Sequence, residues 1–360
     1  MFSRLPFVYL FYFVIGLGTL FSISSSQWLG VWAGLEINLI GFLPLLVYQK
    51  RISERESGVK YFIVQALGSS LLIFGRLAIY SMSFTWETVG RVDREYLIPL
   101  FLIVSGLCIK IGLFPFHFWL PSVIAGLPWI RCLLLATWQK IAPLFLISSV
   151  FDETYIYWFA ISICLMAASS RLIGGIGGIN QTQVRALLAY SSIGHLGWIV
   201  FAILQRSWAI KTYFIIYVLI SFCVFISLWY RNFSFIKNSK SLVRLRYLSL
   251  PVLIILLSLA GLPPLLGFIP KWRVIVASIS IRIWIFVFIL MAGSLISLFY
   301  YLSLFFSLGL GIKMRIKLIK EKNFSIILLL GLFINILGGV PLITAGVTIR
   351  LYALIIFYEP

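Results

Sequence analysis

Long apolar stretches dominate the chain, and they constrain its fold more than any other feature of the sequence. Stretches of about 17–25 residues, enough for a helix to cross a bilayer, alternate with polar or basic clusters. They predict an all-α polytopic membrane protein with about eleven transmembrane helices. The expected helices cover 6–24, 28–48, 59–80, 97–125, 130–150, 154–170, 185–205, 211–230, 249–274, 283–308 and 324–345.

Composition excludes the other broad classes of protein. Hydrophobic residues make up 62% of the 360 residues and charged residues 11%. A soluble domain is about half apolar and about a quarter charged, so this chain has too few charges to cover a soluble surface. A disordered chain would be far less apolar. We therefore expect a single transmembrane domain spanning 1–360.

The net charge of +19 is best explained by membrane topology. In a soluble protein it would suggest a nucleic-acid partner, but basic residues beside membrane spans fix their orientation. If the eleven segments are correct, loops on the N-terminal side carry about eighteen Lys and Arg, Arg131, Arg171 and Arg185 among them, against about seven opposite. This asymmetry predicts an N-terminus on the positive side and a C-terminus on the other, and no nucleic-acid partner.

The sequence offers no cofactor motif. Its four cysteines stand singly in apolar runs without CxxC spacing, which argues against iron–sulfur clusters, and its two isolated histidines argue against haem. The stretch GGIGGINQTQVR is interpreted as a glycine-rich loop. It lacks the GK[ST] ending of a phosphate-binding loop and follows no expected strand, so nucleotide binding is rejected. The N-terminus runs directly into the first span without a presequence, so the chain is expected to be made where it inserts or to use that span as its signal.

Two of the expected spans contain too much proline to be simple rods. Segment 97–125 contains Pro115 and Pro121, and segment 249–274 contains Pro263, Pro264 and Pro270. Proline removes a helical hydrogen bond, and backbone freed at membrane depth has to be satisfied by protein or by water in a cavity. Paired broken helices are typical of an ion or substrate path, although prolines can also merely kink packed helices.

Several ionisable residues fall inside the expected spans. They are Arg76, Lys110, Lys140, Lys271 and, as the only acid so placed, Glu36. Each such charge at the bilayer centre costs about 2.5–3.5 kcal/mol, so ionisable residues there indicate function by default. Arg76 lies within one turn of its span's end and is expected to reach the interface instead.

Structural alternatives exist for each of these positions. Glu36 and Lys110 can form an inert ion pair, and Lys271 lies near an end of its span. Lys140 has no evident acidic partner, so a lysine there can be charged or neutral depending on its neighbours, as a proton relay requires. His195 titrates near neutrality and is either a packing residue or a member of the relay.

Several blocks, in this order, resemble the subunit 2 family of mitochondrial NADH dehydrogenase, respiratory complex I, in animals. They are SSSQWLGVWAGLEINLIGFLPLL, ESGVKYFIVQALGSS, KIGLFPFHFWLPSV, TWQKIAPL, GGIGGINQTQVRALLAYSSIGHLGW and GLPPLLGFIPKW. The resemblance covers roughly residues 25–275. Some of these blocks are also shared with the larger antiporter-like subunits of the complex and with cation/proton antiporters.

The resemblance implies an antiporter-like fold with inverted repeats and a proton-translocating core over 25–275, followed by C-terminal helices and a tail over 276–360. It maps the family's glutamate onto Glu36 and its lysines onto Lys110, Lys140 and Lys271, with broken-helix joints at Pro115, Pro263, Pro264 and Pro270. It also implies that NADH, FMN, iron–sulfur clusters and ubiquinone bind to other subunits, and that those subunits are this chain's partners. Lipids such as cardiolipin are further candidate partners.

The implied place is the inner mitochondrial membrane, with the N-terminus in the matrix and the C-terminus in the intermembrane space. Two other functions remain open from the residues. A free-standing cation/proton antiporter would use the same charges and broken helices. A structural scaffold would hold the charges inert, and their neutralisation would then leave turnover unchanged.

Overall fold

The structure, a computed structural model, describes most of the chain. The described residues are 7–48, 51–86, 97–153, 157–205, 207–231, 246–278 and 283–310, together with 331, 333, 335, 336 and 338. Every regular element in these residues is a helix. In chain order they are α1 (Val8–Ser24), α2 (Trp28–Val47), α3 (Ile52–Ser83), α4 (Leu97–Ile111), α5 (Trp119–Gly126), α6 (Trp129–Ala136), the 3-10 turn η2 (Trp138–Lys140), α7 (Ile141–Glu153), α8 (Tyr157–Ile179), α9 (Val184–Ile203), α10 (Ser207–Arg231), α11 (Arg246–Ala260), α12 (Phe268–Ser278) and α13 (Trp284–Leu310).

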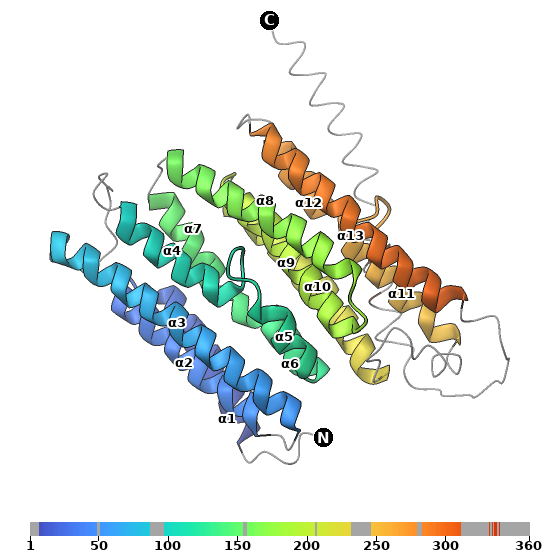
Figure 1. Cartoon of the computed structure of the whole chain (residues 1–360), viewed down its shortest axis with the longest axis horizontal. Coiled ribbons are helices and arrows are strands. Elements are labelled where there is room, and N and C mark those ends of the chain that lie inside the picture. The colour runs from blue at the N-terminus through green and yellow to red at the C-terminus, as the bar shows by residue number, and fades with distance from the viewer. Residues whose placement is uncertain are drawn as a thin grey trace, which may run out of the picture.

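The long helices run roughly parallel to one another in a slab, from α1–α3 at one edge to α11–α13 at the other (Figure 1). Each of the first ten expected segments overlaps at least one helix, and the eleventh, 324–345, falls almost wholly outside the described residues. In the described part, 7 stretches are long and apolar enough to cross a membrane. They are Trp28–Val47, Ile52–Ser83, Trp129–Asp152, Tyr157–Ile179, Val184–Ile203, Ala209–Trp229 and Trp284–Phe306.

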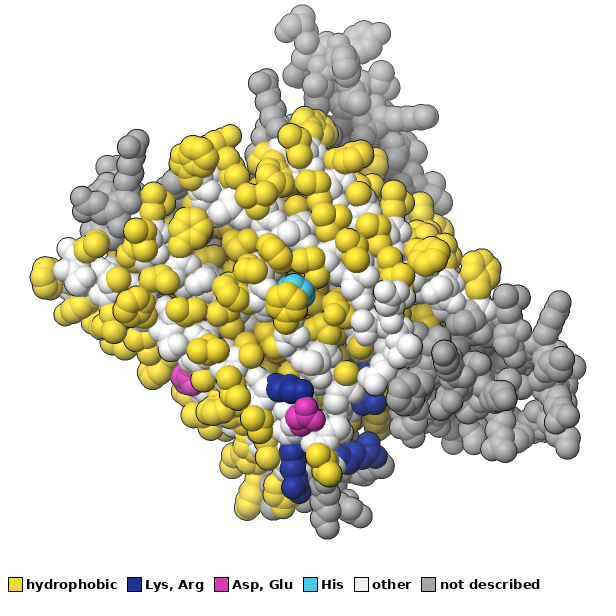
Figure 2. All heavy atoms as spheres, in the orientation of Figure 1, with side chains coloured by type: hydrophobic (Ala, Val, Ile, Leu, Met, Phe, Trp, Pro, Cys, Tyr) yellow, Lys and Arg dark blue, Asp and Glu magenta, His cyan; other side chains and the backbone are white. Residues whose placement is uncertain are grey.

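The outside of the molecule suits lipid. Figure 2 shows a face covered mostly by hydrophobic side chains, with charged side chains gathered toward one end. Large apolar side chains such as Phe288, Ile98 and Leu295 are 77%, 76% and 67% exposed. Water would not tolerate so much continuous apolar surface, whereas lipid tails do. The chain is an all-helical, multi-pass membrane protein.

Both predicted breaks are present. Segment 97–125 is interrupted between α4 and α5, and segment 249–274 between α11 and α12. The first half of each ends on a glycine in the left-handed region, Gly112 at φ 80° and Gly261 at φ 83°, a conformation that costs glycine nothing. A third break was not predicted, because the segment 130–150 has only Pro143: η2 separates α6 from α7 at Trp138–Lys140.

The glycine-rich stretch before residue 180 is helical, so its interpretation as a loop is wrong. Helix α8 continues through it to Ile179. A Cβ on Gly174 would lie 2.6 Å from the backbone nitrogen of Gly194, and one on Gly178 would lie 2.7 Å from the ring of Tyr300. These glycines therefore serve close helix packing, as small residues do between membrane helices, rather than a turn.

This packing predicts different effects for two Gly→Ala changes. Gly174→Ala places a methyl group against the backbone of α9, whereas a Cβ at Gly16 of α1 meets nothing within 4 Å. Both changes gain the same helix propensity, so the difference between their free energies of unfolding reports only the clash at Gly174, about 1–3 kcal/mol. We expect Gly174→Ala, but not Gly16→Ala, to lower the thermal unfolding midpoint of the extracted protein by a few degrees. Equal midpoints would contradict the close α8–α9 contact.

Candidate functional site

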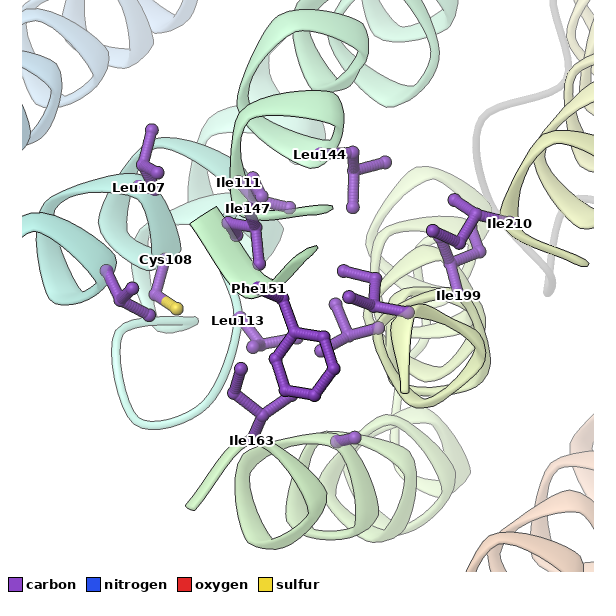
Figure 3. Close-up of a cluster of buried hydrophobic side chains, with 14 of the residues drawn as sticks. Leu107, Cys108, Ile111, Leu113, Leu144, Ile147, Phe151, Ile163, Ile199 and Ile210 are labelled. Carbon is purple, nitrogen blue, oxygen red and sulfur yellow. The ribbon is translucent and has the colours of Figure 1, made fainter. Parts of the chain in front are cut away.

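The buried apolar side chains form two clusters, one toward each end of the parallel helices. The first includes Leu35, Leu107 and Leu113, and Figure 3 shows part of it, with Phe151 of α7 between Leu113, Ile163 of α8 and Ile199 of α9. The second includes Phe42 and Leu188, nearer the other ends of α2 and α9, together with Leu120, Ala136 and Leu256 of α5, α6 and α11.

Most of the predicted charged residues lie where the helices pass from one cluster to the other, whereas Lys110 lies between Cys108 and Ile111 of the first cluster. Helix α9 leaves the second cluster at Ile193 and joins the first at Leu196, with His195 between. Likewise Lys140 lies between Ala136 of the second cluster and Ala142 of the first. We call the side chains at or next to this switch the polar layer: Glu36, Asn38, Gln65, Lys110, Gln139, Lys140, Arg171, His195 and Lys271.

Glu36 and Lys110 form the ion pair at one end of the polar layer. Lys110 Nζ lies 3.9 Å from Glu36 Oε1, and their side chains are 3% and 25% exposed. Lys110 is the second-last residue of α4, just before the first joint. Because the contact is longer than a hydrogen bond, the two groups attract each other without a fixed geometry.

A reciprocal amide pair links the helix of Glu36 to the turn of Lys140. Asn38 Nδ2 donates to Gln139 Oε1 at 2.9 Å, and Gln139 Nε2 donates to Asn38 Oδ1 at 3.1 Å. Tyr61 of α3 adds a long contact, its hydroxyl 3.5 Å from Gln139 Oε1. Asn38 lies two residues after Glu36, and Gln139 directly precedes Lys140. The amide pair therefore holds α2 against η2 beside both charged residues.

Lys140 is buried without an anion. Its side chain is among the most buried in the described residues, and Nζ has no hydrogen-bond partner there. Nζ lies 5.8 Å from the centre of the Tyr217 ring of α10, within reach of a cation–π interaction. None of the ion pairs among the described residues includes Lys140.

His195 connects to both neighbouring lysines. Its ring centre is 5.2 Å from that of Tyr217, the ring that also faces Lys140, and its Nδ1 lies 3.2 Å from the hydroxyl of Tyr213. It also interacts with the backbone of Leu259, near the end of α11. It is buried, so it lies in the polar layer and not on a lipid-facing surface.

Lys271 is also buried, and it does not extend to the interface. Its Nζ donates to the carbonyl of Ala260 at 2.6 Å, the residue after Leu259 and the last of α11. A Cβ on Gly261 would collide with this ammonium group. The second joint therefore supplies both an acceptor and the space for Lys271.

The predicted joint prolines divide into two groups. Pro115, Pro263 and Pro264 lie in the interruptions themselves. Pro270 does not: it is the third residue of α12, as Pro121 is of α5. The first N–H groups of a helix have no partner within it, so proline is tolerated there and marks the start of each second half.

Two expectations about charged residues are wrong or incomplete, and one unexpected acid is buried. Arg171, assigned to a loop, lies inside α8 and is 1% exposed. Glu54, which lies outside the expected spans, is 1% exposed and lies 3.0 Å from the buried Arg131, whereas the side chain of Glu36 is 25% exposed. Arg76 extends past the end of α3, as expected, and its Nη2 donates to the carbonyl of Thr85. Its side chain is nevertheless buried and not exposed.

His117, not singled out from the sequence, is also buried. It lies in the first joint, 4% exposed, with Nδ1 lacking a hydrogen-bond partner in the described residues. The signal available was its position two residues after Pro115 in the interrupted span.

Comparisons with known proteins agree with this geometry. The family model described as "NADH:quinone oxidoreductase/Mrp antiporter, TM" matches residues 25–297. NADH-ubiquinone oxidoreductase chain 2 of Anopheles gambiae is 40% identical over 345 residues, which are 93% of this chain and 96% of that protein. This chain belongs to the NADH-ubiquinone oxidoreductase chain 2 family. The resemblance inferred from the sequence is thereby confirmed.

Relatives in other animals and a solved structure extend the comparison. Chain 2 of Myxine glutinosa is 40% identical over 300 residues, 82% of this chain and 84% of that protein. A chain in the structure of respiratory complex I from Thermus thermophilus with bound aureothin has a TM-score of 0.78 at 26% identity, covering 94% of this chain and 77% of that one. The fold is therefore the antiporter-like fold of these membrane subunits.

The amide pair between α2 and η2 allows a double-mutant test. Asn38→Leu leaves the buried Gln139 amide unpaired, at a cost of about 1–3 kcal/mol, while Asn38→Leu with Gln139→Leu removes both polar groups. We expect a lower thermal midpoint for the single variant and partial recovery in the double variant. Strictly additive losses would show that the two amides do not interact.

Proposed function

We propose that this chain is a membrane subunit of NADH:ubiquinone oxidoreductase, respiratory complex I, and that its polar layer carries protons across the membrane during electron transfer. One observation carries this proposal: buried titratable side chains from separate helices lie at or next to the switch between two apolar clusters. Buried ionisable groups are expensive in a membrane and mark ion or proton paths. Family membership supplies the reaction to which such a path would be coupled.

The contacts support the following order for the proposed relay. Glu36 and Lys110 form its first pair. Lys140 follows, connected to Glu36's helix through the amide pair and to His195 through the ring of Tyr217. His195 and Lys271 lie next to the adjacent residues Leu259 and Ala260. Between the lysines, His195 acts as a relay member and not only as a packing residue.

Charge changes at the first pair drive the later steps. Quinone reduction elsewhere in the complex separates Glu36 from Lys110, and the altered field at Lys140 moves its proton toward His195 and Lys271 or back. The joints give α4 and α11 the freedom that this requires. Moving one elementary charge against 100 mV costs about 2.3 kcal/mol, an energy that changes at buried ion pairs can supply.

We further propose eleven transmembrane segments arranged with inverted repeats. The support is directional: the broken helix α4–α5 passes from the first cluster to the second, whereas α11–α12 passes from the second to the first. Each first half ends on a left-handed glycine, and each second half has proline as its third residue. The core of the relay is assigned to 25–275, and the C-terminal helices and tail to 276–360.

Placement follows from the charge asymmetry and the animal relatives. We assign the chain to the inner mitochondrial membrane, with its N-terminus in the matrix and its C-terminus in the intermembrane space. Its partners are the other membrane-arm and accessory subunits, with lipids such as cardiolipin on its apolar outer surface. NADH, FMN, iron–sulfur clusters and ubiquinone are assigned to other subunits.

Lys140→Met tests the centre of the relay. Methionine keeps the length of the side chain and removes the charge, so we expect the complex to assemble while proton-coupled NADH oxidation falls at least tenfold. Lys211→Met is the matched control, because Lys211 is an exposed lysine of α10. The measurement is proton translocation per NADH oxidised in vesicles containing the whole complex. Wild-type stoichiometry in Lys140→Met would reject the relay and leave the scaffold function.

Gly261→Ala tests whether the second joint holds Lys271 in place. Alanine at positive φ strains the backbone at Gly261 and at Gly112 alike, by roughly 1–2 kcal/mol. Only at Gly261 does the new methyl group meet a lysine ammonium; at Gly112 it meets Leu120, 2.7 Å away. We expect a larger loss of proton-coupled turnover per assembled complex in Gly261→Ala than in Gly112→Ala. Equal losses would attribute both effects to backbone strain alone.

A further inference from the structure

Arg171 occupies a space that two other helices leave open for it. A Cβ on Gly194 of α9 would lie 2.5 Å from its Nη1, and a Cβ on Gly293 of α13 would lie 2.8 Å from its Cγ. The side chain is 1% exposed and belongs to α8, which packs on both of these helices. Any larger residue at these glycines would displace the guanidinium, so all three helices contribute to its position.

The guanidinium is only partly compensated. Nη2 donates to Ser297 Oγ at 2.5 Å, while Nε has no hydrogen-bond partner in the described residues. Among those residues, no carboxylate lies within ion-pair distance of it. A buried charge is costly, and an apolar residue of similar volume often stabilises a structure equally well, so packing alone gives a weak reason for an arginine here.

Arg171 lies beside the last two members of the relay. Gly194, which abuts the guanidinium, directly precedes His195, and both His195 and Lys271 interact electrostatically with Arg171. An arginine stays charged at all accessible pH values, so it can neither accept nor release a proton. It therefore acts on its neighbours as a constant positive charge.

The other groups near His195 do not offset this charge. The tyrosines among them are neutral near pH 7 and the remainder are cationic when protonated. Those near His195 come from η2, α10 and α12: Lys140, Tyr213, Tyr217 and Lys271. Tyr300 and Tyr301 of α13 interact with Arg171 instead. None of the further titratable groups on α9 and on the helices that pack on it is among the charges that act on His195, for example Arg131, Cys132, Asp152, Cys164, Arg185, Tyr190, Lys211 and Arg273.

We propose that Arg171 is a positioning residue that sets the pH range over which His195 and Lys271 pass on their proton. This proposal rests on the relay of the proposed function. A constant positive charge beside these two groups opposes the arrival of a proton and promotes its release, so the last step of the relay does not hold the proton. Without that charge, both groups keep a proton to higher pH.

Four variants in the intact complex test the charge separately from the packing. Arg171→Gln removes the charge, and Ser297→Asp places a carboxylate against Nη2 and neutralises it. Arg171→Lys keeps the charge, and Ser297→Asn keeps a neutral polar neighbour. The measurement is the pH profile of proton translocation per NADH oxidised. We expect both neutralising variants to shift the profile to higher pH, on the order of one unit, and both controls to leave it in place.

Each other outcome overturns the proposal in a distinguishable way. An unchanged profile in all four variants, with Lys140→Met inactive, would reject the role of Arg171 and keep the relay. Equal shifts in Ser297→Asp and Ser297→Asn would replace the charge by a hydrogen-bonding role. Loss of assembly in both neutralising variants, with the controls assembled, would make Arg171 a structural brace. An active Lys140→Met would reject the proposed function itself.

Discussion

The structure depends on one constraint: backbone groups freed inside a membrane have to find partners in the protein. At the first joint, Trp119 Nε1 donates to the carbonyl of Ile109 at 3.1 Å and Gln65 Nε2 to that of Lys110 at 3.3 Å. At the second joint, Lys271 itself donates to Ala260, and the N–H of Leu266 donates to the carbonyl of Asn335 at 3.3 Å. The interrupted helix thus creates the acceptor that makes a buried lysine tolerable.

The three lysines of the polar layer are compensated to different degrees. Lys110 has a carboxylate at 3.9 Å, Lys271 a backbone carbonyl, and Lys140 only the face of a tyrosine ring. Lys140, in the middle, thus has neither a carboxylate nor a hydrogen-bond acceptor at its ammonium group among the described residues.

Much of this arrangement could be predicted from the sequence, because single residues carried the signal. A charged residue within an apolar run and a cluster of prolines can be recognised without knowing what packs nearby. This is why Glu36, Lys140 and the two joints could be predicted from the sequence. What failed depended on partners from distant segments. The glycines of α8 look like a loop until Gly194 and Tyr300 are known to lie against them, and Arg171 was assigned to a loop with them. Likewise, the burial of Glu54 depends on its ion pair with Arg131, 77 residues further along the chain.

With Arg171 included, the polar layer has far more basic groups than acidic ones. Among the described residues its one acid, Glu36, lies at one end, while Lys140, His195, Lys271 and Arg171 have none of their own within ion-pair distance. If all of these cations were charged together, their mutual repulsion in a low-dielectric interior would far exceed what the few hydrogen bonds offset. In the proposed relay, groups that cannot all be protonated at once would pass a proton on instead of each holding one.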